Sequence, residues 1–300
     1  MPLTIWRFTD KRAGHDSQSN GLCNAIAEHV NSEIIDIDIT QNRLSIQEVL
    51  LNKYIPGNVL PVPDLLVGAG HKTHFSMLLA RRTHGGEIIV IMRPTLPCQF
   101  FDYCIIPEHD EPQNKHNIIV TYGAINSIKQ QSAPDPNIGL ILIGGPSRHY
   151  SWDKETLIEM LNKIINEDKS IKWTISDSPR TPSDASRLIQ QKFIKTTFVS
   201  HKDCEHDWLK SQLNVCGKIW ITEDSISMIY EALTAGTRTG VIPVPDKKNG
   251  KIKRNINKLR KDKMITNYND WLSGNELLIP ATPLAEVNRC VKYLADQGLF

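Results

Sequence analysis

The residues best suited to hold a charged ligand lie within residues 219–236, which read as a buried strand, a polar turn and a helix. Asp224 and Ser225 both favour the start of a helix, and Gly236 stands where that helix should end. Between them the apolar residues recur at helical spacing, as Ile226, Ile229 and Leu233. A turn that leads from a strand into a helix can hold a phosphate group, because the first backbone N–H groups of a helix have no partner within it.

Side chains in this turn add to the predicted anion site. The hydroxyls of Ser225 and Ser227 lie beside the helix start, and Glu231, further along, could accept hydrogen bonds from ribose hydroxyls. The alternative is an ordinary capped helix of an α/β domain, since Ser and Asp begin many helices. The local pattern alone leaves both interpretations open.

Two further turns carry residues of the same kinds. One is Gly144-Gly145-Pro146-Ser147-Arg148, and the other is Ser176-Asp177-Ser178-Pro179-Arg180-Thr181-Pro182. Each follows a predicted strand, so the three turns should meet at one edge of a sheet and surround a diphosphate with backbone donors, hydroxyls and charge. The expected ligands of that diphosphate are Gly144, Gly145, Ser147, Arg148, Ser176, Ser178, Arg180, Thr181, Asp224, Ser225 and Ser227.

A fourth turn, residues 10–19, follows the first predicted strand and carries His15 beside Asp16. An imidazole titrates near neutral pH, so His15 is a candidate general base. The alternative is a solvated or capping histidine, and attention would then move to Asp16 or to Glu108, in another turn of the same half. His71 and His74 are three residues apart without a third ligand, so no metal site is expected.

Two α/β halves should position these turns. Short apolar runs alternate with amphipathic stretches, which predicts doubly wound, mostly parallel sheets with strands at residues 3–8, 34–39, 65–67, 88–92, 103–106 and 118–121, and then at 138–143, 172–175, 197–199, 218–222 and 240–244. The polar, proline-containing residues 126–137 suggest a boundary. We expect domains at residues 1–132 and 133–282, and a C-terminal helix within 283–300 that could pack back on the first domain. The carboxyl ends of the two sheets should face one cleft.

The charge of the chain is uneven. The formal net charge is +2, but residues 246–263 carry +7 and the remainder −5, so a local basic surface is expected and no nucleic-acid partner. Residues 247–263 could contact an anionic surface, either the membrane that carries a lipid-linked acceptor or a phosphorylated glycan. They could also form a solvated helix face, because Ile252, Ile256 and Leu259 are spaced to bury one side.

Several classes of protein are disfavoured. The six cysteines lack metal-site spacing and are typical of reduced thiols, and the chain has neither a secretion signal nor an apolar run of membrane-spanning length. We therefore expect a cytoplasmic protein. The alternative is a protein that contacts the inner membrane peripherally. The Rossmann Gly-x-Gly-x-x-Gly, P-loop and Gly-x-Ser-x-Gly signatures are absent, which argues against oxidoreductases, NTPases and α/β-hydrolases.

Five motifs, in order along nearly the whole chain, resemble the mitochondrial fission Elm family of bacteria and plants, which is also described as predicted nucleoside-diphosphate-sugar epimerases. They are Thr9-Asp10-Lys11-x-Ala13-Gly14-His15-x-x-Gln18-Ser19, Pro63-Asp64-Leu65-Leu66-Val67-Gly68-Ala69-Gly70-His71-x-Thr73-His74, Pro107-Glu108-His109-Asp110, Ile143-Gly144-Gly145-Pro146-Ser147 and Thr222-Glu223-Asp224-Ser225-x-Ser227-Met228. The resemblance implies a two-domain glycosyltransferase-B (GT-B) fold, similar to UDP-N-acetylglucosamine 2-epimerases and to the transferase that adds N-acetylglucosamine to lipid-linked muramyl peptide.

The resemblance also implies roles. The second domain would grip a nucleotide sugar, with Ser225, Ser227, Met228 and Glu231 around phosphate and ribose, and His15 would face the acceptor. The expected activity is transfer of a sugar to a glycan or lipid-linked acceptor in cell-envelope or lipopolysaccharide assembly, with Arg180 stabilising the leaving diphosphate. No cofactor is expected, because the nucleotide sugar is a substrate. The alternatives are a nucleotide-sugar 2-epimerase and a non-catalytic membrane-division factor on the same scaffold.

Overall fold

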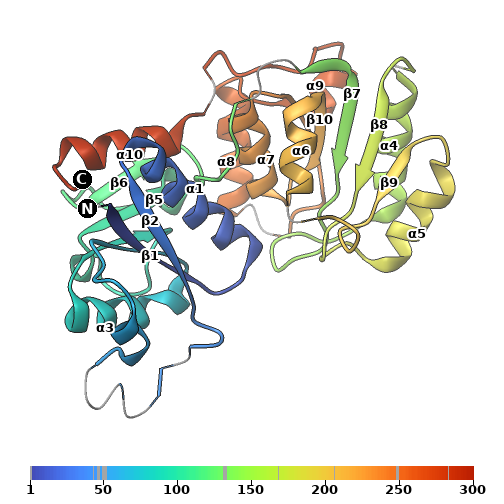
Figure 1. The fold of residues 1–300 in the computed structure, drawn as a ribbon. Coiled ribbons are helices and arrows are strands. Elements are labelled where there is room, and N and C mark those ends of the chain that lie inside the picture. Colours follow the sequence, from blue (N-terminus) through green and yellow to red (C-terminus); the bar gives the residue numbers. More distant parts are fainter. Residues whose placement is uncertain are drawn as a thin grey trace. The chain divides into compact units, whose positions relative to one another are not determined.

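The chain divides into two compact units, residues 1–127 with 285–300, and residues 128–284. The computed structural model describes residues 2–42, 44–45, 48, 53–130, 134–167, 169–205, 207–247, 250–282 and 284–300. The predicted domain boundary, between residues 132 and 133, lies outside the described residues. Pro283, where the C-terminal segment is expected to begin, also lies outside them. Within the described part each unit is built on a six-stranded parallel sheet (Figure 1).

The first unit confirms the six strands that the sequence predicts for it. Within the described residues the strand order is β2-β1-β3-β4-β5-β6. Its elements are β1 (Leu3–Thr9), α1 (Ala13–His29), β2 (Ser32–Asp38), the 3-10 turn η1 (Ile55–Val59), β3 (Leu65–Ala69), η2 (His71–Thr73), α3 (His74–His84), β4 (Glu87–Ile91), η3 (Cys98–Phe100), β5 (Tyr103–Pro107), η4 (Glu108–Asp110), β6 (Ile118–Thr121) and α10 (Glu286–Asp296).

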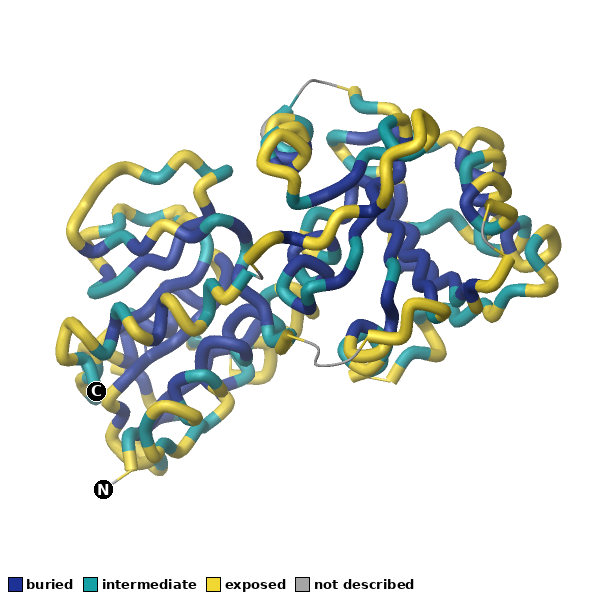
Figure 2. Tube along the Cα trace, turned by 90° about the horizontal axis from the view of Figure 1, so that it is seen from above, coloured by how far each residue is buried: buried dark blue, intermediate teal, exposed yellow. Residues whose placement is uncertain are grey.

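Helices bury both faces of this sheet, and that burial is why its strands read as continuous apolar runs. Successive side chains of a strand point to opposite faces, so Ile5 packs in a cluster with α1 and α10 while Trp6 and Phe8 pack in a cluster with α3. Figure 2 shows buried strands inside each unit and exposed residues on its outer helices. The C-terminal helix α10 lies against α1, and its Cys290, Val291 and Leu294 are part of the first cluster (Figure 1).

The second unit has the order β12-β11-β10-β7-β8-β9 within the described residues, again with parallel pairing. Its elements are β7 (Asp135–Leu142), α4 (Lys154–Glu167), β8 (Lys172–Ser176), α5 (Ser183–Lys192), β9 (Thr197–Val199), α6 (Trp208–Val215), β10 (Cys216–Thr222), α7 (Ile226–Ala235), β11 (Arg238–Ile242), α8 (Lys251–Lys261), β12 (Thr266–Asn267) and α9 (Tyr268–Leu272).

Strand β7 begins three residues earlier than its apolar run predicts. Its first residue, Asp135, pairs with Cys216 of β10, and Pro136 falls within the register shift between Cys216 and Lys218. Proline lacks the N–H that a regular ladder needs, and such an irregularity tolerates it. A polar, proline-containing segment was therefore read from sequence as a linker although part of it is strand.

His74, the first residue of α3, should make the stability of the first unit depend on pH. Its side chain is 1% exposed, and burial, with a smaller contribution from His71, lowers its pKa to about 4. The free energy of unfolding is therefore highest above the unfolded pKa of about 6.5, where His74 is neutral in both states. It falls as pH drops toward the folded pKa, with a slope of up to about 1.4 kcal/mol per pH unit. Urea unfolding at stepped pH should show this slope in the wild type and a shallower one in His74→Gln. The exposed His116→Gln should keep the wild-type slope, and parallel curves for wild type and His74→Gln would contradict the prediction.

Candidate functional site

Three predicted turns meet at the carboxyl edge of the second sheet. They follow β7, β8 and β10, and β7 and β10 are the central neighbours from which the chain proceeds to opposite sides of the sheet. Open parallel sheets bind ligands at such a switch point. The turns at Gly144, Arg180 and Asp224 are therefore the candidate ligand-binding turns of this unit.

The first and third turns are joined by hydrogen bonds. Gly144 N–H donates to Thr222 Oγ1 at 2.8 Å, and Gly145 N–H donates to Asp224 Oδ2 at 3.0 Å. A Cβ atom on Gly144 would lie 2.1 Å from Asp224 Oδ2 and 2.4 Å from Ser225 Oγ. Only glycine permits this approach, so the Gly-Gly pair brings the two turns into contact.

Arg180 connects all three turns. Its Nη1 lies 2.7 Å from Asp224 Oδ2 and donates to Gly145 O at 3.0 Å, and its Nη2 donates to Ser225 Oγ at 3.0 Å. The Asp224 carboxylate is fully buried, whereas the Arg180 side chain is 40% exposed. A guanidinium carries five donors, so Arg180 can hold this cluster together and still present N–H groups to a ligand.

The second turn is fixed by Thr181. Its hydroxyl donates to the carbonyl of Ile143 at 3.1 Å and receives the Ser178 N–H at 2.9 Å. Ser178 is almost fully buried, and its own hydroxyl lies 3.1 Å from that of Thr181. Both residues therefore position Arg180, and their hydroxyls are already engaged within the unit.

The start of α7 lacks the side-chain cap that the sequence predicts. Ser225 stands at the N-cap position, but its hydroxyl contacts Arg180 and Asp224 instead of capping the helix. The first N–H groups of α7 thus remain open to an anion, as at other helix starts that bind phosphate. Asp224 neutralises part of the Arg180 charge. Ser227 is exposed in the first turn of α7, and Met228 and Glu231 are half-buried on the same helix.

Three other predicted ligands are not brought into this cluster. The Ser147 hydroxyl accepts the N–H groups of His149 and Tyr150 and so closes its own turn. Arg148 is exposed and donates through Nε to His149 Nε2 at 2.8 Å. Ser176 is buried at the end of β8 and donates to the neighbouring Asp177 carbonyl at 3.4 Å.

Two polar pairs near these turns were not found from sequence. The Glu223 carboxylate is fully buried and receives both of its 2.9 Å contacts from Lys253 Nζ on α8; burial raises the pKa of Glu223 although Lys253 opposes the shift. Burial would also raise the pKa of Asp177, but hydrogen bonds from the His201 N–H, the Ser186 hydroxyl and the His201 imidazole outweigh it and lower that pKa. The signal available in the sequence was the acidic residue that follows β8, Asp177, and the one that follows β10, Glu223.

His15 in the first unit is held by a carboxylate. Its Nδ1 lies 3.0 and 3.1 Å from the two oxygens of Asp10, whose side chain is 1% exposed, while the His15 side chain is 16% exposed. A carboxylate accepts hydrogen bonds, so Nδ1 donates and Nε2 is the nitrogen left to take a proton. Asp10, rather than the neighbouring Asp16, is the partner that orients the imidazole.

This pair lies where the first sheet changes direction, between β1 and β3. Gly70 follows β3 with a φ of 82°, and a Cβ atom there would lie 2.3 Å from His15 Cε1. The imidazole therefore packs directly on glycine backbone at the carboxyl edge of the sheet. This is the second place in the chain where a ligand of an open α/β sheet is expected.

The other two predicted catalytic residues have different surroundings. Asp16 accepts a hydrogen bond from the Thr9 hydroxyl and lies 3.8 Å from Arg7 Nη1, inside an ion network that includes Asp36. Glu108 is exposed and begins η4, which follows β5, two strands away from β3 in the sheet. Neither is brought to His15 by a hydrogen bond.

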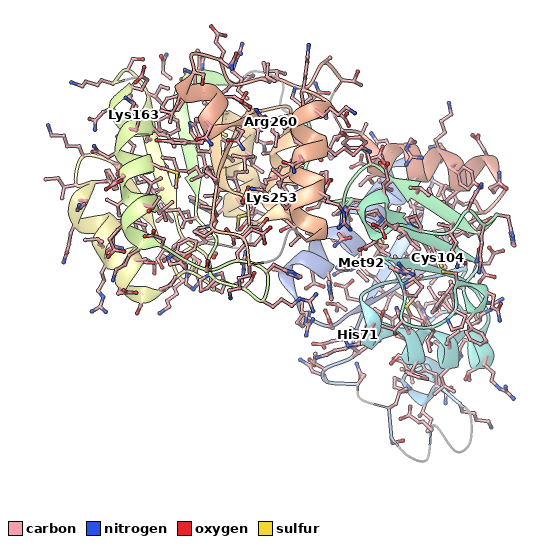
Figure 3. All side chains as sticks on the ribbon, turned by 180° about the vertical axis from the view of Figure 1, so that it is seen from behind. His71, Met92, Cys104, Lys163, Lys253 and Arg260 are labelled. Carbon is pink, nitrogen blue, oxygen red and sulfur yellow. The ribbon has the colours of Figure 1, made fainter. Side chains whose placement is uncertain are left out.

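The basic helix α8 is partly neutralised. Lys253 pairs with the buried Glu223, and Arg260 Nε donates to Asp270 at 2.6 Å; both cations are labelled on α8 in Figure 3. Ile256 and Leu259 are buried, as their spacing predicts. Lys248 lies outside the described residues. Part of the charge counted in the sequence is thus used within the second unit.

The described residues offer neither a metal centre nor a membrane-spanning helix. No group of histidine, cysteine, aspartate and glutamate side chains there is arranged to hold a metal ion. No helix in that part of the chain is long and apolar enough to cross a membrane.

A family model described as mitochondrial fission ELM1 matches residues 13–297. The chain belongs to this family. The match includes both the Asp224 turn and the His15 region of this ELM1-family chain. Its sequence is also 24% identical over 331 aligned residues to the uncharacterised protein RP120 of Rickettsia prowazekii, covering 90% of this chain and 92% of that protein.

Solved structures share the fold. A Listeria monocytogenes protein described as a UDP-N-acetylglucosamine 2-epimerase has a TM-score of 0.62 at 13% identity, covering 99% of this chain and 97% of that one. Staphylococcus aureus MnaA, solved with UDP, has a TM-score of 0.54 at 13% identity and coverages of 99% and 98%. The forosaminyltransferase SpnP has a TM-score of 0.52 at 12% identity and coverages of 100% and 92%. These likenesses confirm the expected GT-B-type α/β fold class.

Proposed function

We propose that this ELM1-family protein is a glycosyltransferase that uses a nucleoside-diphosphate sugar. The second unit holds the diphosphate at the start of α7, and the first unit presents the acceptor hydroxyl to His15. The observation that carries the proposal is the convergence of Gly144, Arg180 and Ser225 on an uncapped helix start. Such a helix start with an arginine beside it suits a diphosphate better than a neutral ligand.

The proposed reaction uses one residue from each unit. His15 Nε2 takes the proton of the acceptor hydroxyl as its oxygen forms a bond to the anomeric carbon, and the bond from that carbon to the diphosphate oxygen breaks. Arg180 and the α7 N–H groups stabilise the negative charge that develops on the leaving diphosphate. An acceptor in cell-envelope glycan or lipopolysaccharide assembly is the finer proposal, and a contact of α8 with anionic lipid is not required by it.

A nucleotide-sugar 2-epimerase is the second candidate, favoured by the structural likeness to proteins described by that activity. It would convert the sugar of UDP-N-acetylglucosamine without any acceptor, and NMR of the sugar after incubation would detect the epimer. A non-catalytic scaffold would bind the nucleotide and do neither. Release of nucleoside diphosphate only when an envelope lipid or glycan fraction is present would identify the transferase.

The first test is nucleotide binding. UDP, GDP, CDP and dTDP should be compared with uridine in a thermal-shift panel, because a ligand that binds only the native state raises the unfolding temperature. At least one diphosphate should stabilise the chain by about 2.7 kcal/mol at a concentration near 100 times its Kd, whereas uridine should have little effect. No shift with any diphosphate would overturn the proposed site.

A serine double variant refines this test. Replacing Ser225 and Ser227 by alanine should weaken diphosphate binding by about 1–3 kcal/mol in total, because the exposed Ser227 hydroxyl at the helix start is lost and Ser225 no longer holds Arg180 in place. Calorimetry would measure the change. Ser147→Ala is the matched control, because that hydroxyl closes its own turn, and its affinity should stay near wild type.

A further inference from the structure

A cavity of about 550 Å³ lies in the second unit, toward the amino ends of its strands. Its walls come from the end of α4, from β8, β10 and β11, and from α9 and the segment after it. They include Trp173, Trp220, Trp271, Arg238, Asn275 and Glu276. The proposed diphosphate site lies at the carboxyl ends of the same strands. The residues that line the cavity do not include those of the turns at Gly144, Arg180 and Asp224, so the two sites use different side chains.

Pairs of tryptophan and glycine on neighbouring strands form the floor of this cavity. Trp173 of β8 stands opposite Gly139 of β7, and Trp220 of β10 stands opposite Gly240 of β11. A Cβ atom on either glycine would lie 2.3 or 2.4 Å from the facing indole, so each ring packs closely against strand backbone and is almost fully buried. A third ring, Trp271, is 5.2 Å from Trp220 at an interplanar angle of 73°.

The polar groups of the cavity balance in charge. Lys218 and Arg238 are opposed by Glu167 and Glu276, with Asn275 beside them. Arg238 donates to the Leu277 carbonyl at 3.2 Å. The indole Nε1 of Trp173 is buried and has no partner within the described residues, although buried tryptophans usually donate this N–H. A neutral ligand that offers both an apolar face and oxygen acceptors would suit these walls.

From these features we infer that the cavity binds a neutral saccharide of one or two rings. One face of a pyranose is made of C–H groups and would pack on the half-buried indole of Trp271, backed by Trp220, while its hydroxyls pair with amide, carboxylate and guanidinium groups. The volume falls within the range of 300–1,000 Å³ typical of small-molecule sites. The inference does not depend on the proposed transferase activity, since no residue of the cavity belongs to the diphosphate site.

The six tryptophans of the chain allow a direct test by NMR of their ¹⁵N-labelled indole groups. The full-length protein is titrated with methyl glycosides of glucose, galactose, mannose and N-acetylglucosamine and with the disaccharides cellobiose, maltose and chitobiose. With at least one of them, the signals of Trp173, Trp220 and Trp271 should shift along a saturable curve with a Kd of about 1 mM or lower. Trp6, in the first unit, and Trp208, outside the cavity, should not respond.

Variants separate this site from any other. Trp271→Ala should weaken saccharide binding at least tenfold, whereas Trp208→Ala, also a half-buried tryptophan, should leave it unchanged. If Trp271→Ala does not fold, the exposed Asn275→Ala replaces it and should weaken binding about threefold or more. The inference is overturned if no saccharide shifts the three signals, if these variants bind as well as wild type, or if UDP displaces the saccharide.

Discussion

His15→Ala should lower sugar transfer by roughly a hundredfold or more while leaving nucleoside-diphosphate affinity nearly unchanged, as expected when a general base is lost. The physical reason is the geometry of its partner: Asp10 holds Nδ1 and so directs Nε2 away as the proton acceptor. Release of nucleoside diphosphate in the presence of the acceptor fraction measures turnover, and calorimetry with the diphosphate measures donor binding.

Two variants serve as controls for His15. His71→Ala removes an exposed histidine from the end of β3, at the same edge of the sheet, and should keep at least half of the activity. Asp10→Asn keeps the size of the side chain but allows the wrong tautomer of His15, so kcat should fall about tenfold or more with the donor KM unchanged. Full activity in His15→Ala would assign the Asp10–His15 pair a structural role.

Arg180→Gln should damage both stability and nucleotide binding. It leaves the fully buried Asp224 carboxylate without its cation, and such a loss costs about 3–5 kcal/mol at a wholly buried pair. Because Arg180 is 40% exposed and solvent screens it, we expect about 1–3 kcal/mol here, measured by urea unfolding. Diphosphate affinity should fall tenfold or more, since a charge-assisted donor is lost.

Two further variants distinguish structure from binding. Arg148→Gln removes the exposed arginine of the neighbouring turn and should change neither quantity much, because its recorded contact is with His149. Arg180→Gln combined with Asp224→Asn should recover part of the stability, since no buried charge remains, but not the diphosphate affinity. If the double variant regained full affinity, Arg180 would act only by neutralising Asp224.

The positions of the strands and of the turns after them could largely be predicted from the sequence because both faces of each sheet are buried. A strand that is buried on both faces has apolar residues along its whole length, and a polar turn follows at its end, as after Ile219–Thr222 or Leu65–Ala69. The predicted start of β7 was wrong by three residues because Pro136 is typical of a linker, whereas a register shift accommodates it in the strand.

Pairings between segments distant in the sequence could not be predicted in the same way. Arg148 and Arg180 occupy turns of similar composition, and only the packing of β8 beside β7, with β10 on the other side, places Arg180 between Gly145 and Asp224. The same holds for the basic segment 246–263. The sequence gives the number of its charges, but only the fold shows that Lys253 and Arg260 have carboxylate partners.

The sequence by itself determined the two α/β halves and the strand-to-helix turn at Asp224, because local periodicity and turn chemistry depend on neighbours within a few positions. The anion site at that turn and the role of His15 as a base stay predictions. The tertiary structure alone decided that Asp10 orients His15, that Gly144 must be glycine for Asp224 to approach, and that Trp173 and Trp220 lie on glycines of other strands. These contacts form only when strands far apart in the chain align in register, since that alignment is set by the burial of the whole sheet rather than by any one segment.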